Sequence, residues 1–280
     1  MTRQTKRRVT GVVRTIVLLF YFLLVILPIY WIIVTSFKTN AEIVNTQNIT
    51  YWPHIFTLEN YRNLFSTMHY STYLKNSLIV TLSTAFVVTL LSIYGGYGMA
   101  RFKFKGKGAA TIFFLITQMI PSILVIIPMY VFFARVKLID TYQALFIFYT
   151  ITNLPFCAIT MRSFFEGIPY VLEEAAFVDG CSRSQTLWKV VLPVMFPDIV
   201  AVFVFAFIGA WNELIAGTIF LNTQKMWTIP IGLKALVGKH NVDWGAMMAG
   251  GVLALLPTAI MFVFVQKYIV EGLTAGAVKG

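Results

Sequence analysis

The stretch that decides the fold reads Glu174-Ala175-Ala176-Phe177-Val178-Asp179-Gly180 and is followed by Leu192-Pro193. Apolar windows enclose it on both sides, at residues 141–161 and 199–221. Lipid offers no hydrogen-bond partners, so a polar stretch between two membrane-length windows must emerge at the membrane surface. We therefore expect a polar surface segment over residues 162–198 of a membrane protein.

The same segment contains the signals of a helix, a turn and a second helix. Pro169 suits the start of a helix, and acidic residues at 173 and 174 suit its first turn. Gly180 stands where that helix would end, because glycine accepts a left-handed backbone. Ser182 and Gln185 have the spacing of a capping box for the second helix, which we expect to end before Pro193. We call this expected helix–turn–helix segment the knob. It suits docking to another protein, although many folded loops share its features.

Composition places the rest of the chain in lipid. Of 280 residues, 58% are hydrophobic and 12% are charged, whereas soluble domains carry about 25% charge. The net charge of +11 is clustered between apolar windows, so membrane topology explains it better than nucleic-acid binding does. The scattered histidines and two cysteines fit no metal-ligand spacing, and we expect neither a metal site nor a catalytic site.

Six windows approach the length of about 20 residues that a membrane-spanning helix needs. They are residues 15–37, 76–100, 108–134, 141–161, 199–221 and 244–266. The first is too long for a signal peptide. The fifth contains Glu213, and we expect one helix over Ile199–Leu221. With both termini in the cytoplasm, 14 of the 22 Lys and Arg residues lie inside, which fixes the expected orientation. We expect one transmembrane domain over residues 1–280.

Polar residues inside apolar windows are costly and suggest functional roles. Trp211, Asn212 and Glu213 form one such group, and Asn153 and Gln118 are two further amides. One hypothesis places all five along a solute path. The alternatives are that Trp211 marks the membrane interface, that Glu213 caps a helix break, and that the amides join neighbouring helices.

A known family carries the same pattern. The pattern reads Glu174-Ala175-Ala176, then three residues, Gly180, nine residues, Val190, one residue and Leu192-Pro193. This pattern resembles the signature of binding-protein-dependent ABC importer permeases. The signature has Ile where Val190 stands. Three further stretches are similar to sequences of the carbohydrate branch of this family, above all to the six-span partner of the maltose-type permease pair. They are Pro28-Ile29-Tyr30-Trp31, Ala100-Arg101-Phe102 and Trp211-Asn212-Glu213.

The resemblance implies an all-α, six-span permease of the type I ABC importer architecture in the inner membrane of a prokaryote. It implies a second permease subunit, two ATP-binding subunits and an extracytoplasmic solute-binding protein as partners. The coupling residues would be Glu174, Ala175, Ala176, Asp179, Gly180, Leu192 and Pro193. The solute would be a sugar or an oligosaccharide, with glycerol phosphate or another polar solute as the alternative.

Motifs for ATP hydrolysis are missing from the sequence. Gly106-Lys107-Gly108 does not have the spacing of the phosphate-binding loop G-x-x-x-x-G-K-[ST]. We therefore expect no enzyme activity and no cofactor in this chain, with ATP and Mg²⁺ on a partner ATPase. An ion-coupled secondary carrier is a further alternative, but it would need several ionisable residues at mid-membrane, and Glu213 alone fits.

Overall fold

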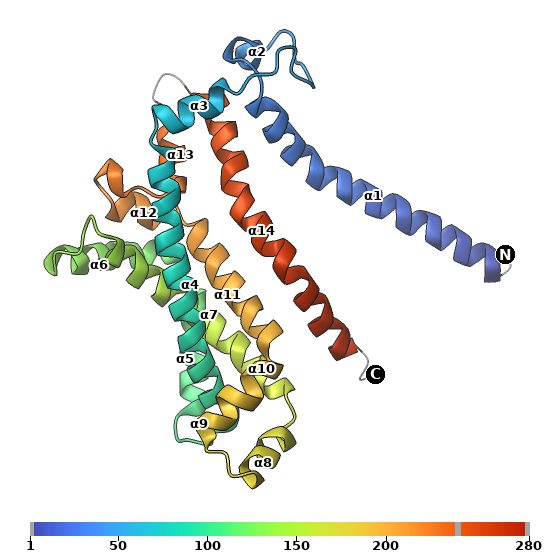
Figure 1. The fold of residues 1–280 in the computed structure, drawn as a ribbon, viewed down its shortest axis with the longest axis vertical. Coiled ribbons are helices and arrows are strands. Elements are labelled where there is room, and N and C mark those ends of the chain that lie inside the picture. The colour runs from blue at the N-terminus through green and yellow to red at the C-terminus, as the bar shows by residue number, and fades with distance from the viewer. Residues whose placement is uncertain (1–2, 239–241, 278–280) are drawn as a thin grey trace. The chain divides into compact units, whose positions relative to one another are not determined.

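The computed structural model describes residues 3–238 and 242–277, with side chains described for residues 10–238 and 242–266. These residues form helices joined by loops, with one isolated bridge between Val237 and Val242 (Figure 1). The order is α1 (Arg3–Ser36), α2 (Asn40–Val44), α3 (Glu59–Ser66), α4 (Tyr70–Arg101), α5 (Lys107–Met119), α6 (Ser122–Arg135), α7 (Tyr142–Gly167), α8 (Val171–Val178), α9 (Arg183–Thr186), η1 (Leu187–Val191), α10 (Leu192–Val194), α11 (Phe196–Trp211), α12 (Ile215–Phe220), η2 (Gln224–Met226), α13 (Ile229–Ala235) and α14 (Trp244–Ala277).

Four helical segments are long and apolar enough to cross a membrane by themselves: Thr10–Ser36, Tyr70–Arg101, Tyr142–Gly167 and Trp244–Gln266. Two bent pairs raise the number to as many as six if each pair counts as one span. The segment Thr10–Ser36 buries none of its most apolar window against the rest of the chain. Lipid or another subunit must therefore cover this helix.

Packing divides the chain into two compact units. The first comprises Met1–Tyr70 and Leu233–Leu256, and the second comprises Ser71–Gly232 and Pro257–Gly280. In the first unit, the buried amide of Asn60 donates hydrogen bonds to the carbonyls of Ser36 and Lys38, both at 2.9 Å. These bonds fix α3 against the end of α1, because buried backbone carbonyls require a donor.

The core of the second unit lies where α6, α7, α11 and α12 meet. The ring of Phe220 stands edge-on to Phe133 and Phe148, with centroid distances of 5.2 and 5.4 Å. All three side chains are at most 1% exposed. Edge-to-face aromatic pairs add to the burial of apolar area, so this cluster anchors the short α12 to the longer helices.

The structure bends the third expected window. Residues 108–134 were expected to form one span, but α5 ends at Met119 and α6 starts at Ser122, with an angle of 97° between them. Pro121 causes the bend, because proline has no N–H and disfavours a helical backbone in the residue before it. Ile120 is accordingly extended, with ψ at 119°.

The fifth window also differs from the expected single helix over Ile199–Leu221. Helix α11 starts earlier, at Phe196, and ends at Trp211, and α12 starts at Ile215. Residues 212–214 therefore form a break in the middle of an apolar window. A polar residue that satisfies the backbone groups at this break makes the interruption tolerable in lipid.

A glycine allows α4 and α7 to pack closely. A Cβ atom on Gly96 would lie 2.9 Å from the backbone nitrogen of Arg162 and 2.9 Å from Cγ of Met161. Gly95 and Gly98 on the same helix have open space at the corresponding positions. Only Gly96 of this cluster is therefore required by helix packing.

A polar contact joins the α6–α7 loop to the segment after α12. Asp140 has a left-handed backbone, with φ at 62°. Its carboxylate accepts hydrogen bonds from the backbone N–H groups of Asn222 and Thr223, both at 2.9 Å, and from the Thr223 hydroxyl. The hydroxyl bond, followed by the backbone bond from Thr223, holds the pKa of Asp140 below its usual value of 3.8.

We expect this contact to be lost in acid. A carboxylate with a lowered pKa stabilises the fold at neutral pH, and that stabilisation disappears as the pH falls below 3.8 and the group takes up a proton. Hydrogen-exchange protection of the Asn222 and Thr223 amides should therefore fall with the pH. Asp140→Asn should make this protection low and independent of pH, because asparagine also tolerates a left-handed backbone. The same pH dependence in both proteins would contradict the assignment.

Candidate functional site

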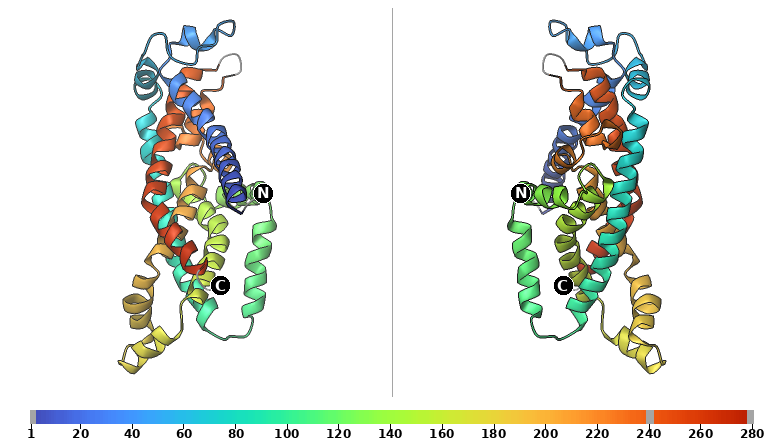
Figure 2. Two further views of the ribbon diagram at one scale, coloured as in Figure 1. Left: turned by 90° about the vertical axis from the view of Figure 1, so that its right-hand side faces the viewer. Right: turned by 90° about the vertical axis from the view of Figure 1, so that its left-hand side faces the viewer.

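The expected knob is formed by α8, α9, η1 and α10 of the second unit. It lies at the carboxyl end of α4, and α8 extends past that end (Figures 1 and 2). Gly180 ends the first helix with φ at 85°, and its N–H donates to the carbonyl of Phe177 at 3.0 Å. Ser182 and Gln185 form a complete capping box for α9. The sequence therefore correctly predicted the turn of this knob and the start of its second helix.

The end of the second helix differs from the expectation. The helix was expected to stop before Pro193, but residues 187–191 form a π-helical turn that leads into α10, which contains Pro193. The N–H of Leu192 donates to the carbonyl of Leu187, five residues back. This wider turn shifts the hydrogen-bond register just before a residue that has no N–H, so the chain stays helical through Pro193.

The predicted coupling residues divide into an exposed and a buried set. Ala176 and Leu192 are only 5% and 7% exposed, so they hold the knob together. The remaining five are exposed and available to another molecule: Glu174, Ala175, Asp179, Gly180 and Pro193. The exposed set combines small residues with acidic ones.

A buried ion pair attaches the knob to the end of α4. Nε of Arg101 lies 2.5 Å from Oε1 of Glu173, and the Tyr97 hydroxyl donates to Oε2 at 2.8 Å. We call Tyr97, Arg101 and Glu173 the clamp. The side chains of Arg101 and Glu173 are 10% and 1% exposed, so both charges are largely removed from solvent. Each charge needs the other, because an unpaired buried charge is strongly unfavourable.

Further contacts join the end of α4 and the residue after it to the segment before α8 and to the start of α9. The Arg101 guanidinium donates to the carbonyl of Ile168 at 2.9 Å and lies over the ring of Tyr170. The Arg183 guanidinium lies 5.0 Å from the ring centre of Phe102. These contacts thus attach the knob to the end of α4.

Sequence reasoning missed the clamp. It assigned Glu173 to the first turn of a helix and proposed no partner for Arg101. The two residues are 72 positions apart, and their pairing depends on how α4 and α7 cross. The sequence offered one signal for the clamp: Glu173 is an acidic residue on the face of the predicted helix that would point toward the protein.

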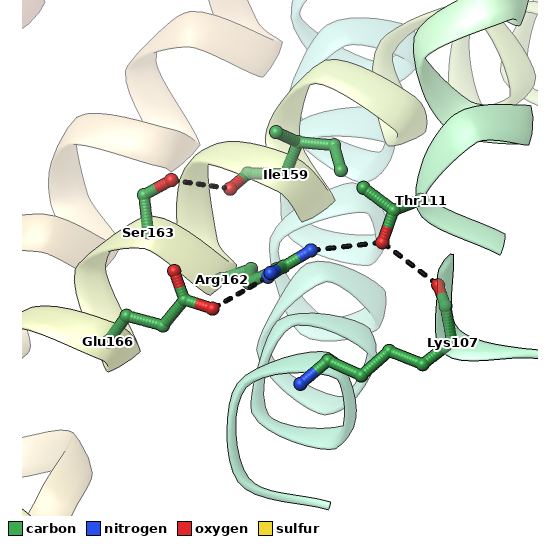
Figure 3. A network of polar contacts seen from close by, with 6 residues as sticks. All are labelled: Lys107, Thr111, Ile159, Arg162, Ser163 and Glu166. Atoms are coloured by element: carbon green, nitrogen blue, oxygen red, sulfur yellow. Dashed lines mark hydrogen bonds and ion pairs between the residues drawn. The ribbon is translucent and has the colours of Figure 1, made fainter. Parts of the chain in front are cut away.

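A more exposed polar network joins α5 to α7 (Figure 3). Arg162 donates to the Thr111 hydroxyl at 2.9 Å and pairs with Glu166 at 2.8 Å. The side chains of Arg162 and Glu166 are 24% and 45% exposed. Exposed ion pairs of this kind contribute little to stability, at most about 1 kcal/mol.

Glu213 lies in the break between α11 and α12 and caps the second of these helices. Its carboxylate accepts from the backbone N–H groups of Ala216 at 2.9 Å and Gly217 at 3.1 Å. It also accepts from the Tyr149 hydroxyl at 3.1 Å. This geometry supports the alternative in which Glu213 caps a helix break, and it explains how the break is tolerated in an apolar window.

Two of the other polar residues lie close to this break. The Asn153 amide donates to the backbone carbonyl of Tyr149 at 2.7 Å, and its oxygen packs where a side chain on Gly209 would stand. Asn153 therefore sits at the contact of α7 with α11. Trp211 is 4% exposed and stacks on Phe207, whereas Asn212 is exposed.

Gln118 is placed differently from the other polar residues. It is exposed on α5, and its amide donates at 3.3 Å to the carbonyl of Phe114 on the same helix. The structure therefore links Asn153 and Glu213 through Tyr149 and leaves Gln118 as a separate polar group.

We expect Glu213→Ala to destabilise the protein by about 0.5–2 kcal/mol, the usual cost of losing a helix cap. Glu213→Gln should have a smaller effect, because the amide oxygen still accepts a hydrogen bond. The measurement is the free energy of unfolding in detergent, and the exposed Asn212→Ala is the matched control, with a change within about 0.5 kcal/mol. A Glu213→Ala protein of unchanged stability with impaired transport would instead indicate direct contact with the solute.

Comparison with known proteins agrees with this architecture. The family described as binding-protein-dependent transport system inner membrane component matches residues 89–274. The diacetylchitobiose uptake system permease protein DasC of Streptomyces coelicolor is 34% identical, and the alignment covers 92% of this chain and 94% of DasC. The trehalose/maltose transport system permease protein MalG of Thermococcus litoralis is 35% identical, with 90% and 91% covered.

A solved structure shares the fold. A chain from the crystal structure of a bacterial ABC transporter involved in the import of the acidic polysaccharide alginate superposes with a TM-score of 0.81 at 22% identity. The match covers 96% of this chain and 98% of that one. The protein is thus a multi-pass, all-α membrane protein, and it belongs to the family of binding-protein-dependent transport system inner membrane components.

Proposed function

We propose that this chain is the transmembrane permease subunit of an ATP-driven ABC importer for a sugar or an oligosaccharide. The observation that carries the proposal is the knob: a helix with exposed Glu174 and Ala175, fixed to α4 by the buried Arg101–Glu173 pair. A segment that couples ATP hydrolysis to transport needs an exposed surface for the ATP-binding subunit and a rigid attachment to the helices that move. The knob has both.

The proposal includes the partners that such a subunit needs. They are a second permease subunit, two ATP-binding subunits that receive the knob, and an extracytoplasmic solute-binding protein. ATP and Mg²⁺ would bind to the ATP-binding subunits, and this chain would carry no cofactor of its own. The complex would reside in the cytoplasmic membrane of a prokaryote, with residues 1–280 as one permease domain.

The proposed orientation places both termini and the knob in the cytoplasm. The basic cluster of residues 101–107 begins at the last residue of α4, Arg101, which belongs to the clamp that holds the knob. Basic residues flanking membrane helices favour the cytoplasmic side. The same side would then carry the positive cluster and the surface that meets the ATPase.

Transport would proceed by alternating access. Closure of the ATP-binding subunits would draw the knobs of the two permeases together, and the clamp would pass the movement to α4. Opening toward the outside would admit solute from the binding protein, and hydrolysis would reset the subunits. Such a cycle requires ATP and solute each to favour one of the two states.

A sugar is the favoured solute because the relatives named above are permeases for diacetylchitobiose and for trehalose and maltose. Glycerol phosphate or another polar solute is the alternative. The break between α11 and α12 would be the place where the second unit approaches the solute path, and Asn212 is exposed there. Glu213 and Asn153 would stabilise the break through their hydrogen bonds to Tyr149. Trp211 would have a structural role in this proposal, and Gln118 would take no part in the solute path.

The decisive experiment purifies the chain with its partners and measures ATP hydrolysis and uptake in proteoliposomes. We expect maltose, trehalose, diacetylchitobiose or a related sugar to stimulate hydrolysis when the binding protein is present. A cysteine at Ala175 should crosslink to an ATP-binding subunit, whereas a cysteine at the buried Ala176 should not. Uptake without ATP and without crosslinks would favour the secondary carrier and overturn the proposal.

A further inference from the structure

A hollow of about 310 Å³ lies in the first unit, where the end of α1 meets α2 and the start of α14. This volume is at the lower end of the range of small-molecule sites. Its lining combines two indole rings with polar groups: Trp31, Thr35, Lys38, Glu42, Asn45 and Trp244. None of these residues belongs to the knob or to the helix break.

One wall of the hollow holds a buried hydroxyl that lacks a partner. Thr35 is 7% exposed, and its Oγ1 atom has no hydrogen-bond partner among the described residues. A buried polar atom without a partner is unfavourable, so its presence requires an explanation. The hydroxyl itself is buried, but Thr35 lines the hollow, so a rotation of its side chain would bring the hydroxyl to a ligand there.

A donor and an acceptor with spare capacity lie on the same lining. Lys38 is 3% exposed; its ammonium donates to the carbonyl of Thr50 and lies 4.7 Å from the ring centre of Trp31. An ammonium has three N–H groups, so two stay available. Oε1 of Glu42 accepts from the Thr50 hydroxyl at 2.5 Å and the His54 N–H at 3.2 Å, whereas Oε2 has no partner among the described residues.

Glu42 is ionised at neutral pH. Partial burial raises its pKa, but hydrogen bonds from Thr50 and His54 and the nearby charges of His54 and Lys38 outweigh that effect and hold the pKa below 4.5. The hollow therefore offers a carboxylate acceptor and an ammonium donor, and the two opposite charges partly offset each other. Their bonds to a hydroxyl would be charge-assisted and hence stronger than neutral ones.

This set of groups selects a ligand class. An anionic headgroup would meet the Glu42 carboxylate, and an acyl chain would leave the Thr35 hydroxyl without a partner. A pyranose has apolar C–H faces that pack on indole rings and a rim of hydroxyls that both donate and accept. We propose that this hollow is a binding subsite for a neutral saccharide, a contact point for the solute of the transport function proposed above.

The test uses the assembled transporter in nanodiscs without its binding protein. The probes are maltose, trehalose and diacetylchitobiose, with phosphorylcholine as the headgroup probe, and saturation-transfer NMR with titration gives the affinity. We expect Trp244→Ala to weaken binding of at least one saccharide by about tenfold through loss of ring stacking. Trp244 is 47% exposed, so the substitution should not disturb the fold. Trp52→Ala is the matched control, since Trp52 is exposed on the same unit outside the lining, and it should bind as the parent does.

Thr35→Val gives an independent readout. It replaces an unpartnered hydroxyl with a methyl group of similar shape, so thermal stability without sugar should be equal or higher while saccharide affinity falls. The inference is overturned if none of the three sugars binds, if phosphorylcholine binds in their place, or if Trp244→Ala binds like Trp52→Ala. Sugar-stimulated ATP hydrolysis with binding protein tests the proposed function separately, and it can succeed when the subsite fails.

Discussion

Glu173→Gln should destabilise the protein by about 3–5 kcal/mol, because it leaves the Arg101 guanidinium buried without a counter-charge. Both charged side chains are at most 10% exposed, and the Tyr97 hydroxyl supplies only one further bond. The free energy of unfolding in detergent measures this effect. In the assembled transporter, the same variant should hydrolyse more ATP for each solute imported, because the knob is less firmly fixed to α4.

Three controls separate the clamp from a general loss of charge. Glu174→Gln changes the neighbouring exposed residue and should leave stability nearly unaltered. Glu166→Gln breaks the exposed pair with Arg162 and should cost at most about 1 kcal/mol. The double variant Arg101→Met with Glu173→Leu should be more stable than either single variant, because apolar side chains can replace a buried pair. Equal stability of Glu173→Gln and Glu174→Gln would refute the clamp.

Gly96→Ala is the second substitution with a large expected effect. Its new methyl group would lie 2.9 Å from a backbone atom of α7, so the two helices must separate. Overpacking of this kind costs about 1–3 kcal/mol, and Gly96→Val should cost more. Denaturant unfolding of the purified protein again gives the magnitude.

Two neighbours on α4 provide the matched controls. Gly95 and Gly98 have open space around their Cβ positions, so alanine at either should be neutral or stabilise the helix by up to about 1 kcal/mol. If Gly95→Ala and Gly96→Ala have equal stability, α4 and α7 do not pack as closely as the structure indicates.

The break at Asn212–Glu213 shows the limit of sequence patterns in an apolar window. Hydropathy favoured a single helix over Ile199–Leu221, since one charged residue does not end a span by composition alone. The capping of Ala216 and Gly217 by the Glu213 carboxylate, together with the Tyr149 hydroxyl on α7, makes the break favourable. Tyr149 is 64 residues away, so no local pattern could reveal this partner.

The sequence by itself determined the features that depend on local chemistry: the apolar windows, the left-handed turn at Gly180 and the capping box at Ser182. These follow from hydropathy and from backbone preferences of single residues. Tertiary structure alone decided which buried charges meet, which glycine is required by packing and which side chains line the hollow beside α2. Those outcomes depend on distances between residues far apart in the chain, and those distances are set by how the helices cross.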